Sequence, residues 1–161
     1  MSVEVRIAGA ADKEALVSLF HAIEVHYSRE RAPTRNAIAR YVEATILGCR
    51  TCEIAIAERD GRAVGLATFA VLYPAPDLGG HFHMKELFTV AEARGQGVGQ
   101  ALMRFLAQLA IKRGCVRLDW TAETDNVAAL SFYDRLGARR VTEKVYFRFD
   151  GEALAAFARE V

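Results

Sequence analysis

Three glycines at alternate positions, Gly95, Gly97 and Gly99, separate two regular patterns in the stretch ARGQGVGQALMRFLA. The residues before them, HFHMKELFTV, alternate as a β-strand does, and the apolar residues after them recur at the spacing of an amphipathic helix. Glycine disfavours a helix interior, so three glycines at this junction indicate a sharp turn. Because VRLDWT beyond the helix resembles another strand, the pattern predicts a strand–glycine turn–helix–strand unit.

This turn is suited to binding an anion. The first amides of a helix have no intrahelical partner, and glycines without a Cβ let a ligand approach them. Arg94 adds a cation whose fork matches phosphate oxygens. A P-loop would need Lys and Ser or Thr after its glycines, and a dinucleotide fingerprint would need glycine where Gln100 stands, so neither common nucleotide motif fits. A turn that binds nothing is the alternative; we favour a phosphate or pyrophosphate.

The rest of the chain predicts one α/β domain over residues 1–161 with a mixed, mostly antiparallel central sheet and flanking helices. Hairpin chemistry at Asp60-Gly61 joins two strand-like runs. The other expected elements are a strand at 3–8, a helix after Asp12, a helix near 38–46, a helix at 126–136, two closing strands in ARRV and KVYFRFD, and a short Ala-rich helix.

Composition excludes several classes of partner. A net charge of +1 without a basic block argues against nucleic acid and membrane partners, and no apolar run reaches the roughly 20 residues of a membrane span. The N-terminus does not resemble a signal peptide, and three cysteines, an odd number, suggest reduced thiols in the cytoplasm. No metal is expected, because the pairs Cys49/Cys52 and His81/His83 each lack further ligands.

The run from Arg94 to Gly99 resembles the Arg/Gln-x-x-Gly-x-Gly/Ala motif of the GNAT superfamily of acyl-CoA-dependent N-acetyltransferases. ELFTV and NVAALSFYDRLGA stand where that family has its cofactor strand and its Asn…Phe-Tyr…Gly helix. Within the superfamily, KELFTVAEARGQGVG, SFYDRLGA and VYFRFD are most similar to the diamine (polyamine and thialysine) acetyltransferases. The resemblance implies a GNAT-type fold, acetyl-CoA as cosubstrate and a homodimer.

The resemblance also implies which residues bind acetyl-CoA. The backbone of one strand would pair with the pantetheine arm, the amides of the turn would bind the pyrophosphate beside Arg94, and one face of the later helix would contact pantetheine. The strand residues are Leu87, Phe88, Thr89 and Val90. The residues of the glycine turn are Gly95, Gln96, Gly97, Val98, Gly99 and Gln100. The residues of the later helix are Asn126, Ala129, Phe132 and Tyr133.

Acetyl transfer to an amine needs a proton donor for the thiolate and a base for the amine. A phenol, with a pKa near 10, keeps its proton at neutral pH, so Tyr133 could donate it to the thiolate, and the resemblance gives it that role. By periodicity alone, packing of Phe132 and Tyr133 in the core is the favoured interpretation. Simple alternation places Glu86 on one strand face with Met84 and Phe88, where apolar neighbours would raise its pKa toward that of a useful base. A solvated charge is the alternative, and a bulge would change the face.

His26, Tyr27, Lys85 and Glu86 match positions that line the acceptor pocket in the diamine acetyltransferases. Helical spacing places Tyr27 on the apolar stripe of its helix and so favours core packing, whereas His26 lies off that stripe. Those relatives have two adjacent acids where this chain has Lys85-Glu86, and a lysine there would repel a polyamine. The expected function is acetyl transfer to a primary amine of a small molecule, of diamine/polyamine or amino-acid type. The alternatives are a protein lysine or N-terminal amine acceptor, and a non-catalytic acyl-CoA-binding regulatory module.

Overall fold

The computed structural model describes residues 2–28, 31–48 and 51–159. The chain divides into two compact units, Met1–Thr121 and Ala122–Val161, and each is described by itself. Cys49, one member of the Cys49/Cys52 pair, lies outside the described residues. None of the helices in the described part of the chain is long and apolar enough to cross a membrane.

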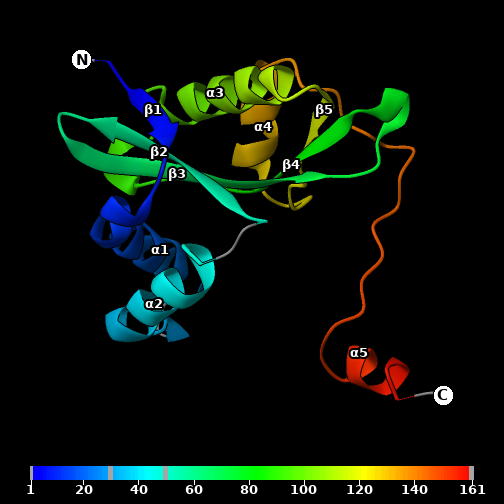
Figure 1. The fold of residues 1–161 in the computed structure, drawn as a ribbon, viewed down its shortest axis with the longest axis horizontal. Coiled ribbons are helices and arrows are strands. Elements are labelled where there is room, and N and C mark those ends of the chain that lie inside the picture. Colours follow the sequence, from blue (N-terminus) through cyan, green and yellow to red (C-terminus); the bar gives the residue numbers. More distant parts are fainter. Residues whose placement is uncertain (1, 29–30, 49–50, 160–161) are drawn as a thin grey trace. The chain divides into compact units, whose positions relative to one another are not determined.

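The first unit is built on one five-stranded sheet in the order β1-β2-β3-β4-β5 (Figure 1). Its strands are β1 (Glu4–Ile7), β2 (Glu53–Arg59), β3 (Arg62–Leu72), β4 (Gly80–Thr89) and β5 (Cys115–Asp119). The first four pair antiparallel and β5 pairs parallel to β4, which confirms the mixed, mostly antiparallel sheet. The β2–β3 hairpin turns at Asp60-Gly61, where φ is 51° and 72°, as its sequence predicts.

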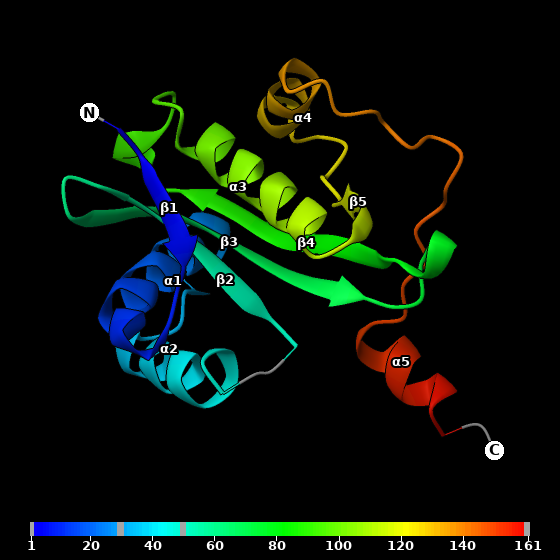
Figure 2. The ribbon, with the colours of Figure 1, turned by 45° about the horizontal axis from the view of Figure 1, so that its top comes forward.

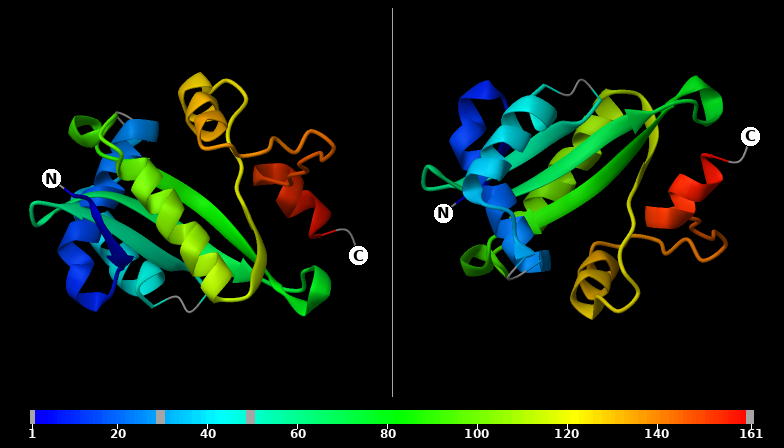
Figure 3. Two further views of the ribbon diagram at one scale, coloured as in Figure 1. Left: turned by 90° about the horizontal axis from the view of Figure 1, so that it is seen from above. Right: turned by 90° about the horizontal axis from the view of Figure 1, so that it is seen from below.

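Helices cover both faces of this sheet (Figure 2). The helices are α1 (Lys13–Ser28), α2 (Arg35–Tyr41), which continues into a π-helical turn at Val42–Ile46, and α3 (Val98–Lys112). On one face, α1 and α2 form a core with the sheet in which Leu16, Ile23, Ile56, Leu66 and Phe88 are buried. On the other face, α3 lies across the strands (Figure 3).

Gly65 sets how closely the start of α3 approaches the sheet. A Cβ built on Gly65 would lie 2.8 Å from the Phe88 carbonyl oxygen and 2.9 Å from Val98 Cγ1. Those distances are too short for a side chain, so glycine here lets the first turn of α3 rest directly on β3. The glycine turn before α3 is thereby held at the end of β4.

A β-bulge at Lys85 changes the face to which β4 points. Thr68 pairs with Glu86 but Phe69 pairs with Met84, which leaves Lys85 as the extra residue. Met84 shares a face with Phe69, whose ring lies under the Arg113 guanidinium at the end of α3. Phe88 lies in the α1–α2 core, two residues beyond Glu86. The single face expected for Met84, Glu86 and Phe88 is therefore wrong: Glu86 and Phe88 face α1, and Met84 faces α3.

The second unit holds α4 (Val127–Arg135) and α5 (Gly151–Phe157). Asn126 caps α4 by accepting a hydrogen bond from the Ala129 amide at 3.1 Å, as the sequence predicts. The closing strands expected in ARRV and KVYFRFD are wrong, since residues 138–150 form no strand in the described structure. Alternating apolar residues become a strand only where another backbone pairs with them. Here the aromatic residues stay exposed instead, with Tyr146 at 73% and Phe147 at 87%.

Candidate active site

The glycine turn connects β4 to α3 and presents backbone amides to solvent. Gly95 and Gly97 have φ of 71° and 81°, and among the described residues no heavy atom beyond their neighbours lies within 4 Å of a Cβ built on either. The first backbone bond of α3 runs from the Ala101 amide to the Gly97 carbonyl at 2.9 Å. The amides of Val98, Gly99 and Gln100 precede that bond and point out of the helix, toward the place where an anion would sit.

Arg94 is anchored beside this turn. Its Nε donates to the Thr89 carbonyl at 3.1 Å, and its guanidinium carbon lies 5.9 Å from the centroid of the Phe88 ring. Arg94 therefore ties the turn to the end of β4 and is exposed at the same time. The remaining N–H groups of its fork are free of that bond and suit an oxyanion.

An open strand edge leads to the turn. The last β4–β5 pair joins His83 to Asp119, where β5 ends, while β4 continues to Thr89. Within the described sheet, the edge of β4 from Met84 to Thr89 that faces away from β3 has no strand beside it. The backbone groups of this edge are available to an extended ligand, as in β-strand addition.

The backbone alternation decides which groups lie on the open edge. The Val90 amide donates to the Val64 carbonyl of β3 at 3.0 Å. In an antiparallel pair every second residue makes such bonds, so Phe88 also turns its amide to β3. The amides of Leu87 and Thr89 point to the open edge. Of the four residues predicted to pair with pantetheine, Leu87 and Thr89 thus present their backbone there, whereas Phe88 and Val90 do not.

Glu86 and Tyr27 meet between β4 and α1. The Tyr27 hydroxyl donates to Glu86 Oε1 at 3.2 Å, and the His26 ring lies 5.1 Å from Tyr27 and 6.1 Å from Phe88, centroid to centroid. The core packing expected for Tyr27 is wrong, because its side chain is 64% exposed. The structure therefore brings together three of the predicted acceptor residues, His26, Tyr27 and Glu86.

Burial is the main cause of the shifted pKa values of Glu86 and Tyr27. Partial burial raises the pKa of Glu86, although the Tyr27 hydrogen bond, the Lys85 charge and the Leu87 amide oppose the rise. The pKa of Tyr27 is raised as well, by desolvation of its hydroxyl end and by the charge of Glu86. Glu86 is therefore half-buried, paired and shifted in the direction that suits a general base. Lys85, in the bulge, is exposed.

The proposed acid and its neighbours lie in the second unit. Tyr133 is half-buried on α4, and its ring centroid is 5.1 Å from that of Phe132. Ala129 lies one helical turn before Tyr133, and its amide donates the capping hydrogen bond to Asn126. Helix α4 thus carries Ala129, Phe132 and Tyr133, and the fourth predicted residue, Asn126, is its N-cap.

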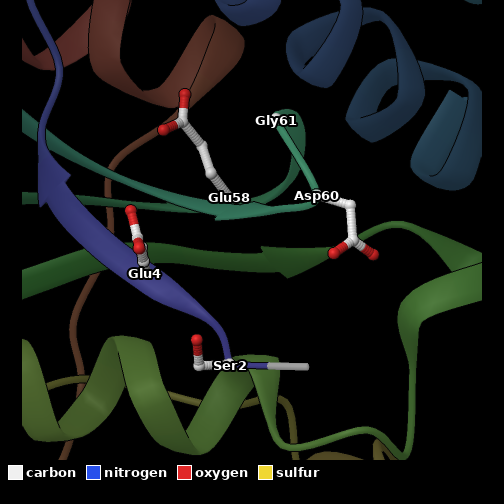
Figure 4. Close-up of a pocket in the computed structure, with 5 residues that line it drawn as sticks. All are labelled: Ser2, Glu4, Glu58, Asp60 and Gly61. Carbon is white, nitrogen blue, oxygen red and sulfur yellow. The ribbon is translucent and has the colours of Figure 1, made fainter.

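Two other polar features do not contain the predicted site. A hollow beside the β2–β3 hairpin is lined by Ser2, Glu4, Glu58, Asp60 and Gly61 (Figure 4). One of its carboxylates, Glu58, pairs with Arg6 at 2.8 Å. His81 and His83 lie with ring centroids 5.8 Å apart, and the described residues hold no group of three His, Cys, Asp or Glu side chains that could bind a metal ion.

Arg59 is a cation at the turn that the sequence did not indicate. Its guanidinium donates to Oε1 of Gln96, and Gln96 Nε2 donates to the Glu92 carbonyl at 2.7 Å. Arg59 stands 37 residues before Gln96, so no local spacing connects them. The Asp60-Gly61 turn marks the end of the hairpin, but only the sheet order places that end beside the loop after β4.

Residues 18–138 match the model of the acetyltransferase (GNAT) family. The thialysine N-epsilon-acetyltransferase of Bos taurus is 32% identical over 83 residues, which cover 50% of this chain and 49% of that protein. The L-ornithine N5-acetyltransferase of Arabidopsis thaliana is 32% identical over 92 residues, or 57% of this chain and 40% of that protein. The chain therefore spans about half the length, or less, of these curated relatives.

A solved structure extends the similarity to nearly the whole chain. An integron cassette protein from the mobile metagenome of V. cholerae has a TM-score of 0.94 and 36% identity, with 99% of both chains covered. This match confirms the predicted fold class.

Proposed function

Since the chain belongs to the acetyltransferase (GNAT) family, we propose that it transfers an acetyl group from acetyl-CoA to a primary amine of a small molecule. The observation that carries the proposal is continuity: the open edge of β4 leads directly into the amides of the glycine turn. A strand edge suits the amide-containing pantetheine arm, and a helix N-terminus suits a pyrophosphate. The open edge of β4 and the glycine turn therefore follow one another in the same order as the pantetheine arm and the pyrophosphate of acetyl-CoA.

The chain supplies three groups for the chemistry. Glu86 accepts a proton from the acceptor amine, directly or through a water molecule. The outward amide of Thr89 donates a hydrogen bond to the thioester oxygen as negative charge develops there. Tyr133 donates its phenolic proton to the sulfur as the C–S bond breaks; because a phenol is a weaker acid than a thiol by ordinary pKa values, expulsion of the thiol from the tetrahedral intermediate has to drive this transfer. Acetyl-CoA supplies the activated acyl group, and Arg94 with the turn holds its diphosphate.

The acceptor is proposed to be a small amine of the diamine or amino-acid class. The curated relatives carry the names of thialysine and ornithine acetyltransferases. Glu86 offers the acceptor one carboxylate, and the exposed Lys85 beside it opposes a second positive charge at that point. An amino acid, whose carboxylate offsets its extra amine, is therefore favoured over a polyamine.

Release of free thiol from acetyl-CoA tests this proposal. The protein is incubated with acetyl-CoA and, separately, L-ornithine, L-lysine, spermidine or a lysine-containing peptide. We expect thiol release to rise above the amine-free rate with an amino acid, and the N-acetylated product to appear by mass spectrometry. Release with the peptide alone would favour a protein acceptor. Tight binding of acetyl-CoA without release for any amine would favour a non-catalytic acyl-CoA-binding module and contradict the proposal.

We further propose a cytoplasmic homodimer. The odd number of cysteines favours a reducing compartment. The exposed aromatic residues Tyr146, Phe147 and Phe149 of the second unit give a second copy an apolar surface to cover.

A further inference from the structure

Arg59 links the β2–β3 hairpin to the glycine turn. It ends β2, one residue before Asp60-Gly61, and its guanidinium donates to the side-chain oxygen of Gln96. Gln96 is itself held by its bond to the Glu92 carbonyl. Two consecutive hydrogen bonds therefore fix a guanidinium group beside Gln96 in the glycine turn, two residues before α3 begins.

The side chain lies on the face of the sheet that carries α3. Ile56 is buried in the α1–α2 core, and Arg59 is three residues further along the same strand, so alternation places it on the opposite face. The adjacent carboxylate of Glu58 is paired with Arg6 at 2.8 Å. Arg59 is half-buried, yet its contact on the turn is with a neutral amide rather than an acid.

This arrangement places a cationic side chain in contact with the turn. One terminal nitrogen of Arg59 bonds Gln96, and the other N–H groups of the fork are available for a second acceptor. In Arg94, by comparison, Nε already donates a hydrogen bond to the Thr89 carbonyl. A ligand with several phosphate charges is held better by two guanidinium groups from two elements than by one, because each can form charge-assisted bonds.

We propose that Arg59 is a second phosphate ligand of this site and binds a phosphate group of coenzyme A. The inference rests on the proposed function, in which the turn binds acetyl-CoA. Its test measures dissociation constants by calorimetry for CoA and for 3′-dephospho-CoA, on the wild-type protein, Arg59→Ala and Arg62→Ala. Arg62 is the matched control, since it pairs with Arg59 across the hairpin and carries the same charge.

We expect Arg59→Ala to weaken CoA binding about tenfold, in line with a lost hydrogen bond to a charged group, and Arg62→Ala to change it less than about twofold. An equal loss for CoA and dephospho-CoA would place Arg59 on the pyrophosphate, and a loss for CoA alone would place it on the 3′-phosphate. Either result supports the inference. Turnover of S-acetylpantetheine, which lacks those phosphates, should be the same in Arg59→Ala and wild type.

Unchanged CoA affinity in Arg59→Ala would overturn the inference, as would equal losses in Arg59→Ala and Arg62→Ala, which would mean a general charge effect. A matching loss with S-acetylpantetheine would also overturn it, because Arg59 would then act only by supporting the turn. Failure of the wild-type protein to bind CoA would instead refute the proposed function. The two failures are therefore distinguishable.

Discussion

At the scale of single residues, the Tyr27–Glu86 hydrogen bond is expected to control the pH dependence of turnover. The bond stabilises the charged carboxylate, so Tyr27→Phe should raise the pKa of Glu86 further above its ordinary value. A base works when deprotonated, and its activity is lost as pH falls through its pKa. The acid limb of kcat/KM should therefore move to higher pH in Tyr27→Phe. If the variant folds as the wild type does and the acid limb does not move, Glu86 is not the base that removes the proton.

Tyr133 is expected to act on the thiolate without contributing much to binding. Tyr133→Phe keeps the ring and removes the hydroxyl group that carries the proton. Turnover should therefore fall at least about tenfold, while the dissociation constant of acetyl-CoA stays nearly unchanged. Tyr73→Phe makes the same chemical change at an exposed tyrosine outside the proposed site; it is the control and should retain most of the turnover. Wild-type turnover in Tyr133→Phe would remove this residue from the mechanism.

Residue roles could be predicted from the sequence only in part. Glu86 was identified, but its face was not, because Lys85 looks like any other strand residue until the pairing with β3 shows a bulge. Tyr27 was assigned to the core because periodicity gives the face of a helix but not what lies opposite. Opposite Tyr27 is a carboxylate rather than an apolar side chain.

At the scale of elements, the backbone of the glycine turn is the part most sensitive to substitution. Gly97 has φ of 81°, so Gly97→Ala strains the turn by about 1 kcal/mol or more and disturbs the amides that follow. Gly114 at the other end of α3 has φ of 69° and is a matched control. Both alanine variants should lose similar stability in urea, but only Gly97→Ala should lose affinity for acetyl-CoA. Equal affinities of the two variants for acetyl-CoA would contradict the proposal that the glycine turn binds its pyrophosphate.

The start of α1 depends on a small ionic cluster. Asp12 pairs with Arg6 at 2.7 Å and also accepts a hydrogen bond from the Gly9 amide at 2.8 Å, and these contacts lower its pKa to about 2. Asp12→Ala should reduce the free energy of unfolding by about 1 kcal/mol at neutral pH. Because a lowered pKa stabilises the fold only while the group is ionised, the difference from wild type should shrink as pH falls from about 4 to about 2. A difference that is independent of pH would contradict this account.

Elements defined by local chemistry were predictable, and those defined by partners were not. The Asp60-Gly61 turn and the Asn126 cap act within a few residues, and both were predicted. The strands expected in ARRV and KVYFRFD have the right alternation, but alternation does not supply a partner strand. Neither does it show where β5 stops and leaves the edge of β4 open.

At the scale of the whole molecule, the proposed homodimer makes a direct prediction. Light scattering should give twice the mass of one chain, and Phe147→Asp should shift the protein toward the monomer by charging an apolar surface. Leu78→Asp changes an apolar residue of the first unit that is even more exposed than Phe147, and it should leave the dimer intact. A wild-type protein that is monomeric at high concentration would contradict the proposal.

The proposed function depends on the main-chain donors of the glycine turn, which would hold the diphosphate of acetyl-CoA. Its most direct test is a titration of ¹⁵N-labelled protein with CoA, followed through the backbone amide resonances. We expect the amide resonances of Gly95, Gly97 and Gly99 to shift strongly and saturate together, while those of Gly61 and Gly114 stay in place. Saturable binding of CoA that leaves the resonances of the turn unmoved would contradict it.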